Sequence, residues 1–258
     1  MNPMKIAFFD IDGTLIDMGL KRMTEPVKQT LVELQKRGVR LCIATGRSPM
    51  TLPKIEGVSF DAFLTFNGSY CYDAEGDIFS NPIPAEDVRT VIQNAHSLGR
   101  TACVATKTRM GADGWEKNLS DYFDIVNLKL ETAPDFENLV HQDVYQILVG
   151  SCPEEYERLI QDAPGAKIAA WWNRGVDVIP SSGGKGVGVE KILARYGLDK
   201  SQAIAFGDGN NDIEMLQAVG TGVAMGNGSA ELKAVADAVC PKVTEDGIYR
   251  YCLENGLI

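Results

Sequence analysis

The stretch Lys5-Ile-Ala-Phe-Phe-Asp10-Ile-Asp12-Gly13-Thr-Leu15 decides how the rest of the chain is organised. Its apolar run, residues 6–9, is typical of a β-strand that is buried on both faces. The run stops at Asp10 and Asp12, which in extended backbone point to the same side, and Gly13 lets the chain turn sharply away. Two like charges at the edge of a core are costly unless a cation or a proton offsets them. A solvated acidic turn would contain the same residues, so the remaining sequence has to decide between a site and a turn.

The composition indicates an ordinary globular protein with one large domain or two modest ones. The chain has 258 residues, of which 45% are hydrophobic and 23% charged, and its net charge is -10. Because no lysine or arginine cluster offsets this charge, we expect neither nucleic acid nor a membrane as a partner. Six scattered cysteines without a Cys-x-x-Cys pair favour buried thiols in a reducing compartment. We therefore expect a cytoplasmic protein without a signal peptide or a membrane span.

The next elements bring further polar residues to the end of the first strand. Thr24-Glu25-Pro26 predicts a helix start, with Thr24 as the cap and proline in the first turn. Residues 39–44 predict a second buried strand, which ends in Thr45-Gly46-Arg47. A strand, a helix and a strand in this order form a parallel unit, and ligands bind outside the carboxyl ends of such strands. Asp10, Asp12 and Thr45 are therefore expected at one place.

The pattern of predicted helices and strands changes after residue 81, which divides the chain into a core and an insertion. A third strand ends at Asn67-Gly68, a hairpin follows over residues 69–80, and Asn81-Pro-Ile-Pro84 marks a linker. Helices and strands then alternate irregularly, and residues 107–138 are hard to read. We predict a small α+β insertion with its helices on one face of a sheet. The fold class is thus α/β, with a parallel three-layer core over 1–81 and 182–258 and an inserted cap over 82–181.

The second half of the core adds a lysine and more acids to the same edge of the sheet. Lys185 opens a predicted helix, and a buried strand at 203–206 ends in Gly207-Asp208-Gly-Asn-Asn211-Asp212. Mg²⁺ prefers oxygen ligands and commonly binds through one or two carboxylates plus a substrate phosphate. The Thr45 hydroxyl and the Gly46 N–H could donate to phosphate oxygens, and Lys185 adds a positive charge. The whole set favours a phosphate held beside a divalent cation.

These motifs, in this order, resemble the four motifs of the haloacid-dehalogenase-like (HAD) phosphohydrolases. The matching residues are Asp10-Ile-Asp12-Gly13-Thr14, Ala44-Thr45-Gly46-Arg47, Lys185 and Gly207-Asp208-x-x-Asn211-Asp212. Asn67-Gly68, the insertion before Lys185 and Gly222-Val-Ala-Met-Gly-Asn227 resemble the Cof-type branch with a cap of subclass IIB, which is sugar-phosphatase-like. The resemblance covers the core and implies its Rossmann-like HAD fold. The cap matches in position and size more than in motif.

The resemblance implies a role for each matched residue. Asp10 would attack phosphorus and become an aspartyl phosphate. Asp12 would protonate the leaving oxygen and then deprotonate the hydrolytic water, while its backbone carbonyl contacts Mg²⁺. Asp208 joins Asp10 as a carboxylate metal ligand, and Asp212 orients the waters of the metal. The implied phosphate-binding residues are Thr45, Gly46, Lys185 and, near the phosphate or the metal shell, Asn211.

Several residues have two interpretations. Arg47 could reach the substrate or form a surface ion pair, and Asn67 could bind phosphate or substrate or simply belong to an Asn-Gly turn. Three residues of the insertion could line a substrate face or belong to its core: Trp171, Trp172 and Arg174. His96 and His141 are expected to be surface or structural residues.

The sequence therefore predicts a cytoplasmic, Mg²⁺-dependent phosphatase that is a monomer or a weak homodimer. Its expected substrate is a small phosphorylated metabolite, with a sugar phosphate as the specific expectation. A phosphomutase would use the same aspartyl phosphate but pass it to a sugar. A non-catalytic phosphometabolite-binding protein is the alternative from another class, and it would have no need of Asp12 as an acid and base. Selectivity is expected to lie in the cap, where the sequence is hardest to interpret.

Overall fold

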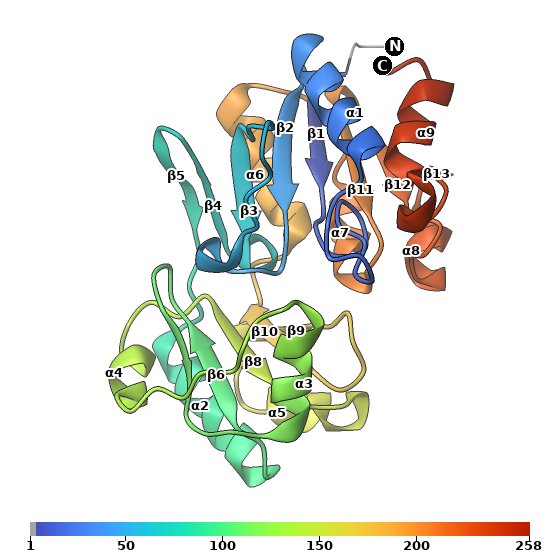
Figure 1. Cartoon of the computed structure of the whole chain (residues 1–258). Helices are drawn as coiled ribbons and strands as arrows, with labels where there is room; N and C mark the ends of the chain where they lie inside the picture. The colour runs from blue at the N-terminus through green and yellow to red at the C-terminus, as the bar shows by residue number, and fades with distance from the viewer. Residues whose placement is uncertain (1–3) are drawn as a thin grey trace. The chain divides into compact units, whose positions relative to one another are not determined.

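The computed structural model describes residues 4–258, which fall into two compact units (Figure 1). Of the described residues, the first unit consists of 4–45, Pro53–Phe79 and Lys185–Ile258, and the second of Gly46–Leu52 and Ser80–Gly184. Each unit is built on its own sheet, a mixed, mostly parallel one in the first and an antiparallel one in the second. The predicted α/β class with an α+β insertion is confirmed.

The sheet of the first unit places the ends of three buried strands side by side. Among the described residues the strand order is β13-β12-β11-β1-β2-β3-β4-β5, parallel from β13 to β3 and antiparallel between β3 and β4. Phe9, the last residue of β1, is paired with Phe206 of β11 and with Ile43 of β2. The residues that follow these strands therefore leave the sheet at one edge. The strands are β1 (Ile6–Phe9), β2 (Arg40–Ala44), β3 (Ala62–Thr65), β4 (Tyr70–Asp73), β5 (Gly76–Ser80), β11 (Ala203–Gly207), β12 (Thr221–Ala224) and β13 (Ala238–Val239).

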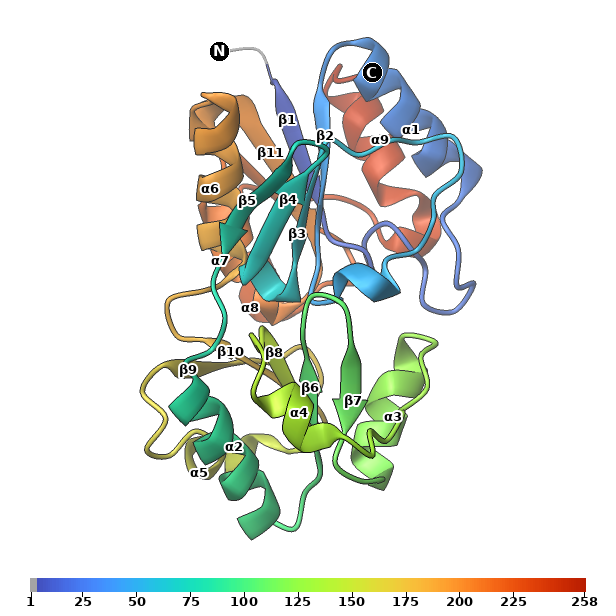
Figure 2. The same cartoon turned by 90° about the vertical axis from the view of Figure 1, so that its left-hand side faces the viewer.

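Helices cover both faces of this sheet and make the first unit three-layered (Figure 2). Ile6 and Phe8 face the side of α6, α7 and α8, where Val189 belongs to the same buried cluster. On the other face Phe9 stacks on Phe206 at 5.3 Å, and Phe206 meets the ring of Tyr251 in α9. Successive side chains of β1 are thus buried on opposite faces of the sheet, as the apolar run of this strand predicts. The helices are α1 (Glu25–Lys36), α6 (Lys185–Tyr196), α7 (Ile213–Gln217), α8 (Ala230–Val235) and α9 (Gly247–Glu254).

The predicted cap of α1 is wrong, whereas α8 does have a side-chain cap. Thr24 makes no side-chain cap to α1, because its hydroxyl donates instead to Asp246 Oδ1 at 2.6 Å, next to α9. Ser229 does cap α8, and its Oγ accepts from the N–H of Leu232 at 3.1 Å. The difference is tertiary, since Thr24 has a partner 222 residues away that the local sequence does not reveal.

The second unit has a sheet in which each described neighbour pair is antiparallel. Its order is β7-β6-β8-β10-β9, with β8 in the middle. Residues 107–138, which are hard to read in the sequence, contain β7, α3 and the start of α4. The elements are α2 (Ala85–Ser97), β6 (Ala102–Ala105), β7 (Met110–Ala112), α3 (Lys117–Ile125), α4 (Phe136–Val140), β8 (Gln146–Val149), α5 (Tyr156–Leu159), β9 (Ala166–Ala169) and β10 (Val176–Pro180).

The expectation that the helices of the insertion lie on one face of its sheet is wrong for α3. Val104 of β6 shares a buried cluster with residues of α2, α4 and α5. Its neighbour Cys103 points the other way and packs with Leu119 and Tyr122 of α3. The sheet is therefore sandwiched, with α3 on the second face.

Two further features concern the length of the helices and the state of the cysteines. Within residues 4–258, every helix is too short or too polar to cross a membrane. All six cysteines are free, and all except Cys152 are buried.

Candidate active site

The chain leaves the sheet immediately after β1 and forms a tight loop. The N–H of Asp10 still bonds to Phe206 O at 3.0 Å, but Ile16 N then returns to Ile11 O at 2.8 Å. Gly13 has a φ of 91°, and a Cβ there would overlap with the carboxylate of Asp208. Glycine is thus required both by the backbone angle and by the close approach of an acid from β11. The loop after β1 and the loop after β11 are consequently in direct contact.

Lys185 joins two acids from different ends of the chain. Its Nζ donates to Asp10 Oδ1 at 2.7 Å and to Asp212 Oδ1 at 2.5 Å. The lysine is 1% exposed, so these are buried charge-assisted bonds. Removing either partner of such a pair leaves an uncompensated buried charge. The sequence predicts Lys185 as a helix start with a phosphate-binding role, and in the structure its ammonium group is held between these two acids.

The remaining acids are held by backbone and hydroxyl groups. Asp212 Oδ2 accepts from the N–H groups of Asp208 and Gly209, both at 3.0 Å. Thr14 donates its hydroxyl to Asp208 Oδ1, also at 3.0 Å. Asp212 is thus oriented by the backbone of its own loop, and Asp208 by a hydroxyl from the loop after β1.

Asp10, Asp208 and Asp212 form a cluster that is suited to a metal ion. One carboxylate oxygen from each lies within 4.8 Å of the others, and Asp10 and Asp212 are buried. Oxygen ligands at the carboxyl ends of strands, with a buried excess of negative charge, fit a hard divalent cation such as Mg²⁺. The Asp12 side chain does not belong to this cluster. β1 ends at Phe9, so both acids lie in the loop that follows it, and the negative charge of Asp12 adds to burial among the causes that raise the pKa of Asp10.

The electrostatics of the cluster show that its charges are not fully balanced. Burial raises the pKa of Asp10 well above its usual value, against the opposing effect of Lys185. Burial, followed by the charge of Asp212, raises the pKa of Asp208 to about 7. Burial alone would lower the pKa of Lys185, but Asp10 and Asp212 together raise it. Three acids share one lysine, and a bound cation would relieve the repulsion that remains.

Small residues let α6 carry Lys185 deep into this site. A Cβ on Gly186 would lie 2.8 Å from Glu214 O, and one on Gly188 would overlap with Leu64. The first turn of α6 therefore lies closer to α7 and β3 than any larger residue would permit. The sequence showed these glycines but gave no reason for them.

The ends of β2 and β3 bring Thr45, Asn67 and Asn211 together. Asn67 N donates to Thr45 O at 3.0 Å, and Asn211 Nδ2 donates to Asn67 Oδ1 at 2.9 Å. Phe66 and Asn67 are consecutive residues with φ values of 51° and 52°, in the left-handed region. Strained backbone of this kind concentrates at functional sites. The turn holds Asn67, which is buried, in contact with the loop that carries Asp208.

Gly46 and Arg47 lie in the segment that belongs to the second unit. The guanidinium of Arg47 donates to the carbonyls of Thr51, at 3.1 Å, and Val126, at 3.3 Å. Two backbone carbonyls therefore hold the Arg47 guanidinium in place.

Two residues without an assigned role in the sequence make contacts inside the site. Thr14 stands in the first motif, and Asn227 in the segment that begins at Gly222. Asn227 Nδ2 lies 2.8 Å from Gly13 O and 3.3 Å from Asp208 Oδ2. Their presence in the motifs was a signal, but their partners are set by tertiary contacts.

The aromatic residues of the insertion pack together. The ring of Tyr122 lies 5.1 Å from Trp171 and 5.9 Å from Trp172, and Arg174 covers Trp172 at 4.5 Å. This favours the packing interpretation of the tryptophans, which follow β9 rather than lying within it. His96 and His141 also lie in the insertion. His96 is exposed and bonds to Asp113, and His141 is exposed at the end of α4.

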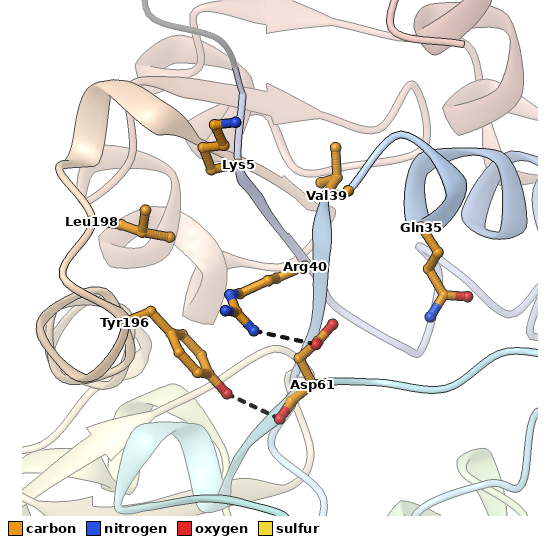
Figure 3. A pocket seen from close by; sticks show the side chains of 8 residues that line it. Lys5, Gln35, Val39, Arg40, Asp61, Tyr196 and Leu198 are labelled. Carbon is orange, nitrogen blue, oxygen red and sulfur yellow. Dashed lines mark hydrogen bonds and ion pairs between the residues drawn. The ribbon is translucent and has the colours of Figure 1, made fainter.

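A pocket in the first unit lies at the opposite ends of the strands (Figure 3). It has a volume of about 440 Å³ and is lined in part by Lys5 and Arg40, at the start of β1 and β2. Arg40 is already bonded to Asp61 at 3.5 Å and stacked on Tyr196 at 4.4 Å. Its lining includes none of the three clustered acids, which follow the carboxyl ends of the strands, where ligands of parallel sheets bind.

Comparison with known proteins agrees with this geometry. Residues 7–252 match the family model of haloacid dehalogenase-like hydrolases. The chain is 34% identical to the putative phosphatase YkrA of Bacillus subtilis, over 98% of both chains. It is 29% identical to the 5-amino-6-(5-phospho-D-ribitylamino)uracil phosphatase YitU of the same organism, over 98% of this chain and 97% of the other.

A solved structure extends the comparison to three dimensions. The HAD subclass IIB sugar phosphatase BT4131 superposes with a TM-score of 0.89 and 29% identity, over 98% of this chain and 100% of the other. The fold, the acid cluster and the family match agree with one another. The chain therefore belongs to the haloacid dehalogenase-like hydrolases of the Cof type, and it is a HAD-type phosphatase.

Proposed function

We propose that this protein is a Mg²⁺-dependent phosphatase that hydrolyses a small sugar phosphate through an aspartyl phosphate on Asp10. The observation that carries the proposal is the cluster of Asp10, Asp208 and Asp212 at the carboxyl ends of β1 and β11, with Lys185 bonded to the first and the last of these acids. The likeness to a sugar phosphatase supports the substrate class. YitU is named for a different phosphorylated substrate, so the relatives support a class and not a compound.

The proposed reaction begins with attack by Asp10. A carboxylate oxygen of Asp10 forms a bond to phosphorus while the bond from phosphorus to the leaving oxygen breaks. Lys185, donating to Asp10 Oδ1, holds this carboxylate in place and favours its ionised form. The carboxylates of Asp10 and Asp208 and the backbone carbonyl of Asp12 would hold Mg²⁺, and Asp212 would orient its waters. When bound, the cation would neutralise charge on the phosphate and act as a Lewis acid.

Asp12 is proposed to move the protons. It gives a proton to the leaving oxygen in the first step and removes one from water in the second. The water oxygen then bonds to phosphorus, inorganic phosphate departs and Asp10 is restored. The Asp12 side chain lies outside the acid cluster, which is consistent with a role in proton transfer and not in side-chain metal binding.

The remaining polar groups are proposed to bind the phosphate and the substrate. Thr45 and the Gly46 N–H would donate to phosphate oxygens beside Lys185. Asn67 and Asn211, bonded to each other, would complete the polar rim of the site. Arg47 would approach the substrate from its anchored position. The second unit, proposed as a cap spanning 82–181, would determine which substrate is accepted.

A panel of phosphorylated metabolites, with p-nitrophenyl phosphate as a general reference, tests the proposal. We expect release of inorganic phosphate with Mg²⁺, no release with EDTA and none from Asp10→Asn. The highest kcat/KM is expected among sugar phosphates. Activity that survives both EDTA and Asp10→Asn would overturn the mechanism, and a preference for phosphates that lack a sugar would overturn the substrate class.

The same experiment separates two rivals. A phosphomutase would return an isomerised sugar phosphate with little inorganic phosphate. A non-catalytic binding protein would bind a metabolite tightly without converting it. The argument against the binding protein is the complete set of acids, because binding alone does not require Asp12.

A further inference from the structure

We propose that Asn227 is a positioning residue that orients the Asp208 carboxylate for metal binding. Asn227 precedes α8, outside the motifs to which the sequence assigns catalytic or phosphate-binding roles. Its Nδ2 lies 3.3 Å from Asp208 Oδ2 and 2.8 Å from Gly13 O. The inference rests on the proposed function, in that it concerns the metal which that function requires.

The contacts determine which way the Asn227 amide points. The N–H of Val243 donates to Asn227 Oδ1 at 2.8 Å. Turning the amide over would place its NH₂ group against this N–H and its oxygen against Gly13 O and Asp208 Oδ2. Every contact would then become repulsive. The donor end of Asn227 is therefore directed at Asp208.

Asn227 and Thr14 hold the two oxygens of one carboxylate. Thr14 donates to Asp208 Oδ1 at 3.0 Å and Asn227 to Oδ2. Both donors are neutral, whereas Asp10 and Asp212 are bonded to the cationic Lys185. Asp208 is thus oriented by neutral donors and has no direct bond to a cation among the described residues, which suits a ligand that must present negative charge to a metal ion. Partners that orient metal ligands in this way typically contribute about 10–100-fold to metal affinity.

The same amide connects three loops around the site. Through Gly13 it reaches the loop after β1, through Asp208 the loop after β11, and through Val243 the segment before α9. Gly13 permits this arrangement because any side chain there would overlap with Asp208. A change at Asn227 should therefore loosen the position of Asp208 relative to Asp10, on which the metal site depends.

Direct measurement of Mg²⁺ binding tests the inference without using catalysis. The dissociation constant for Mg²⁺ is measured by calorimetry on the whole protein, without substrate, for wild type, Asn227→Ala, Thr14→Val and Asn210→Ala. Asn210 is the matched control, because it accepts from Ser229 nearby and lacks a direct hydrogen bond to the three acids. We expect the dissociation constant to rise about tenfold or more in Asn227→Ala and Thr14→Val and to stay unchanged in Asn210→Ala.

The melting temperature separates positioning from a general structural role. Asn227→Ala should also lower the increase in melting temperature that Mg²⁺ produces, and saturating Mg²⁺ should restore much of kcat. If the melting temperature falls in EDTA while the Mg²⁺ dissociation constant equals that of wild type, Asn227 is only structural and the inference is wrong. If Asn227→Ala does not fold, Asn227→Ser, whose side chain is too short to span the same contacts, is measured instead. If wild type itself binds no Mg²⁺, the proposed function fails rather than this inference alone.

Discussion

At the scale of single residues, the positive charge of one lysine only partly balances the negative charges of three buried or half-buried acids. Lys185 contacts Asp10 and Asp212, while Asp208 is bonded to the neutral donors Thr14 and Asn227. The raised pKa of Asp10 and of Asp208 has burial as its largest cause, and neighbouring acids add to it. The site is thus prepared for a cation and is less stable as a fully ionised, metal-free cluster.

Removing the lysine should destabilise the protein as well as inactivate it. Lys185→Met leaves Asp10 and Asp212 buried without a cation, so we expect a loss of about 3–5 kcal/mol in the free energy of unfolding. Urea denaturation of the metal-free protein measures this loss. Lys191→Met is the control, since Lys191 lies on the exposed side of the same helix and only covers the ring of Phe79. An equal effect of both changes would contradict the role given to Lys185.

The pKa of Asp208 predicts how stability and metal affinity depend on pH. Its folded value of about 7 lies above the ordinary value of 3.8, so the folded state binds the proton more tightly than the unfolded state does. Its contribution to stability is complete below about pH 4 and is lost as the pH rises to about 7. Over the same range Mg²⁺ affinity should increase, because the metal requires the carboxylate. Urea midpoints in EDTA, with Asp208→Asn as the variant that should remove this dependence, check the sign.

At the scale of elements, close packing of α6 and a strained turn after β3 place the polar groups. Gly186 and Gly188 let α6 approach α7 and β3, and the left-handed pair Phe66 and Asn67 directs Asn67 toward Asn211. Neither feature follows from hydrophobic periodicity. The sequence predicted the elements and the edge at which their ends meet, whereas these contacts depend on how the elements pack.

Enlarging a glycine of α6 should displace Lys185. Gly188→Ala introduces a Cβ that overlaps with Leu64, so we expect a loss of about 1–3 kcal/mol in stability together with lower activity. Glu190→Ala, at an exposed position of the same helix, should be nearly neutral. Melting temperatures and kcat of the two variants provide the measurement. Full activity in a destabilised Gly188→Ala would show that α6 does not control the site.

Two substitutions at Asn67 should separate strain from function. Asn67→Gly and Asn67→Ala both remove the bond to Asn211, so both should lose activity. Glycine accepts the φ of 52° without a steric penalty, whereas alanine does not, so the glycine variant should be more stable by about 1 kcal/mol. Chemical denaturation of the pair measures this difference. Equal stabilities would mean that the turn relaxes when the side chain is lost.

At the scale of the whole molecule, the core was easier to predict than the insertion for a physical reason. Parallel strands that are buried on both faces produce continuous apolar runs, and their polar ends point to one edge of the sheet. The insertion has shorter elements with mixed patterns, and α3 covers a second face that the sequence did not predict. Thr14 and Asn227 likewise contact Asp208 from 194 and 19 residues away. Such contacts are visible only once the chain is folded.

The aspartyl phosphate on Asp10 is the central claim, and trapping it is the most direct test. Wild type, Asp12→Asn and Asp10→Asn are mixed with p-nitrophenyl phosphate and Mg²⁺ and quenched with acid within one turnover. The peptide that contains residue 10 is then analysed by mass spectrometry. Because p-nitrophenolate is a good leaving group, its departure should not need a proton from Asp12, whereas the proposed mechanism requires Asp12 as a base for breakdown of the phosphoenzyme. We predict a phosphoryl group on Asp10 that accumulates in Asp12→Asn above the wild-type level and is absent from Asp10→Asn. Turnover of the substrate by Asp12→Asn with no phosphorylated Asp10, or an equal phosphoryl signal in Asp10→Asn, would contradict the account.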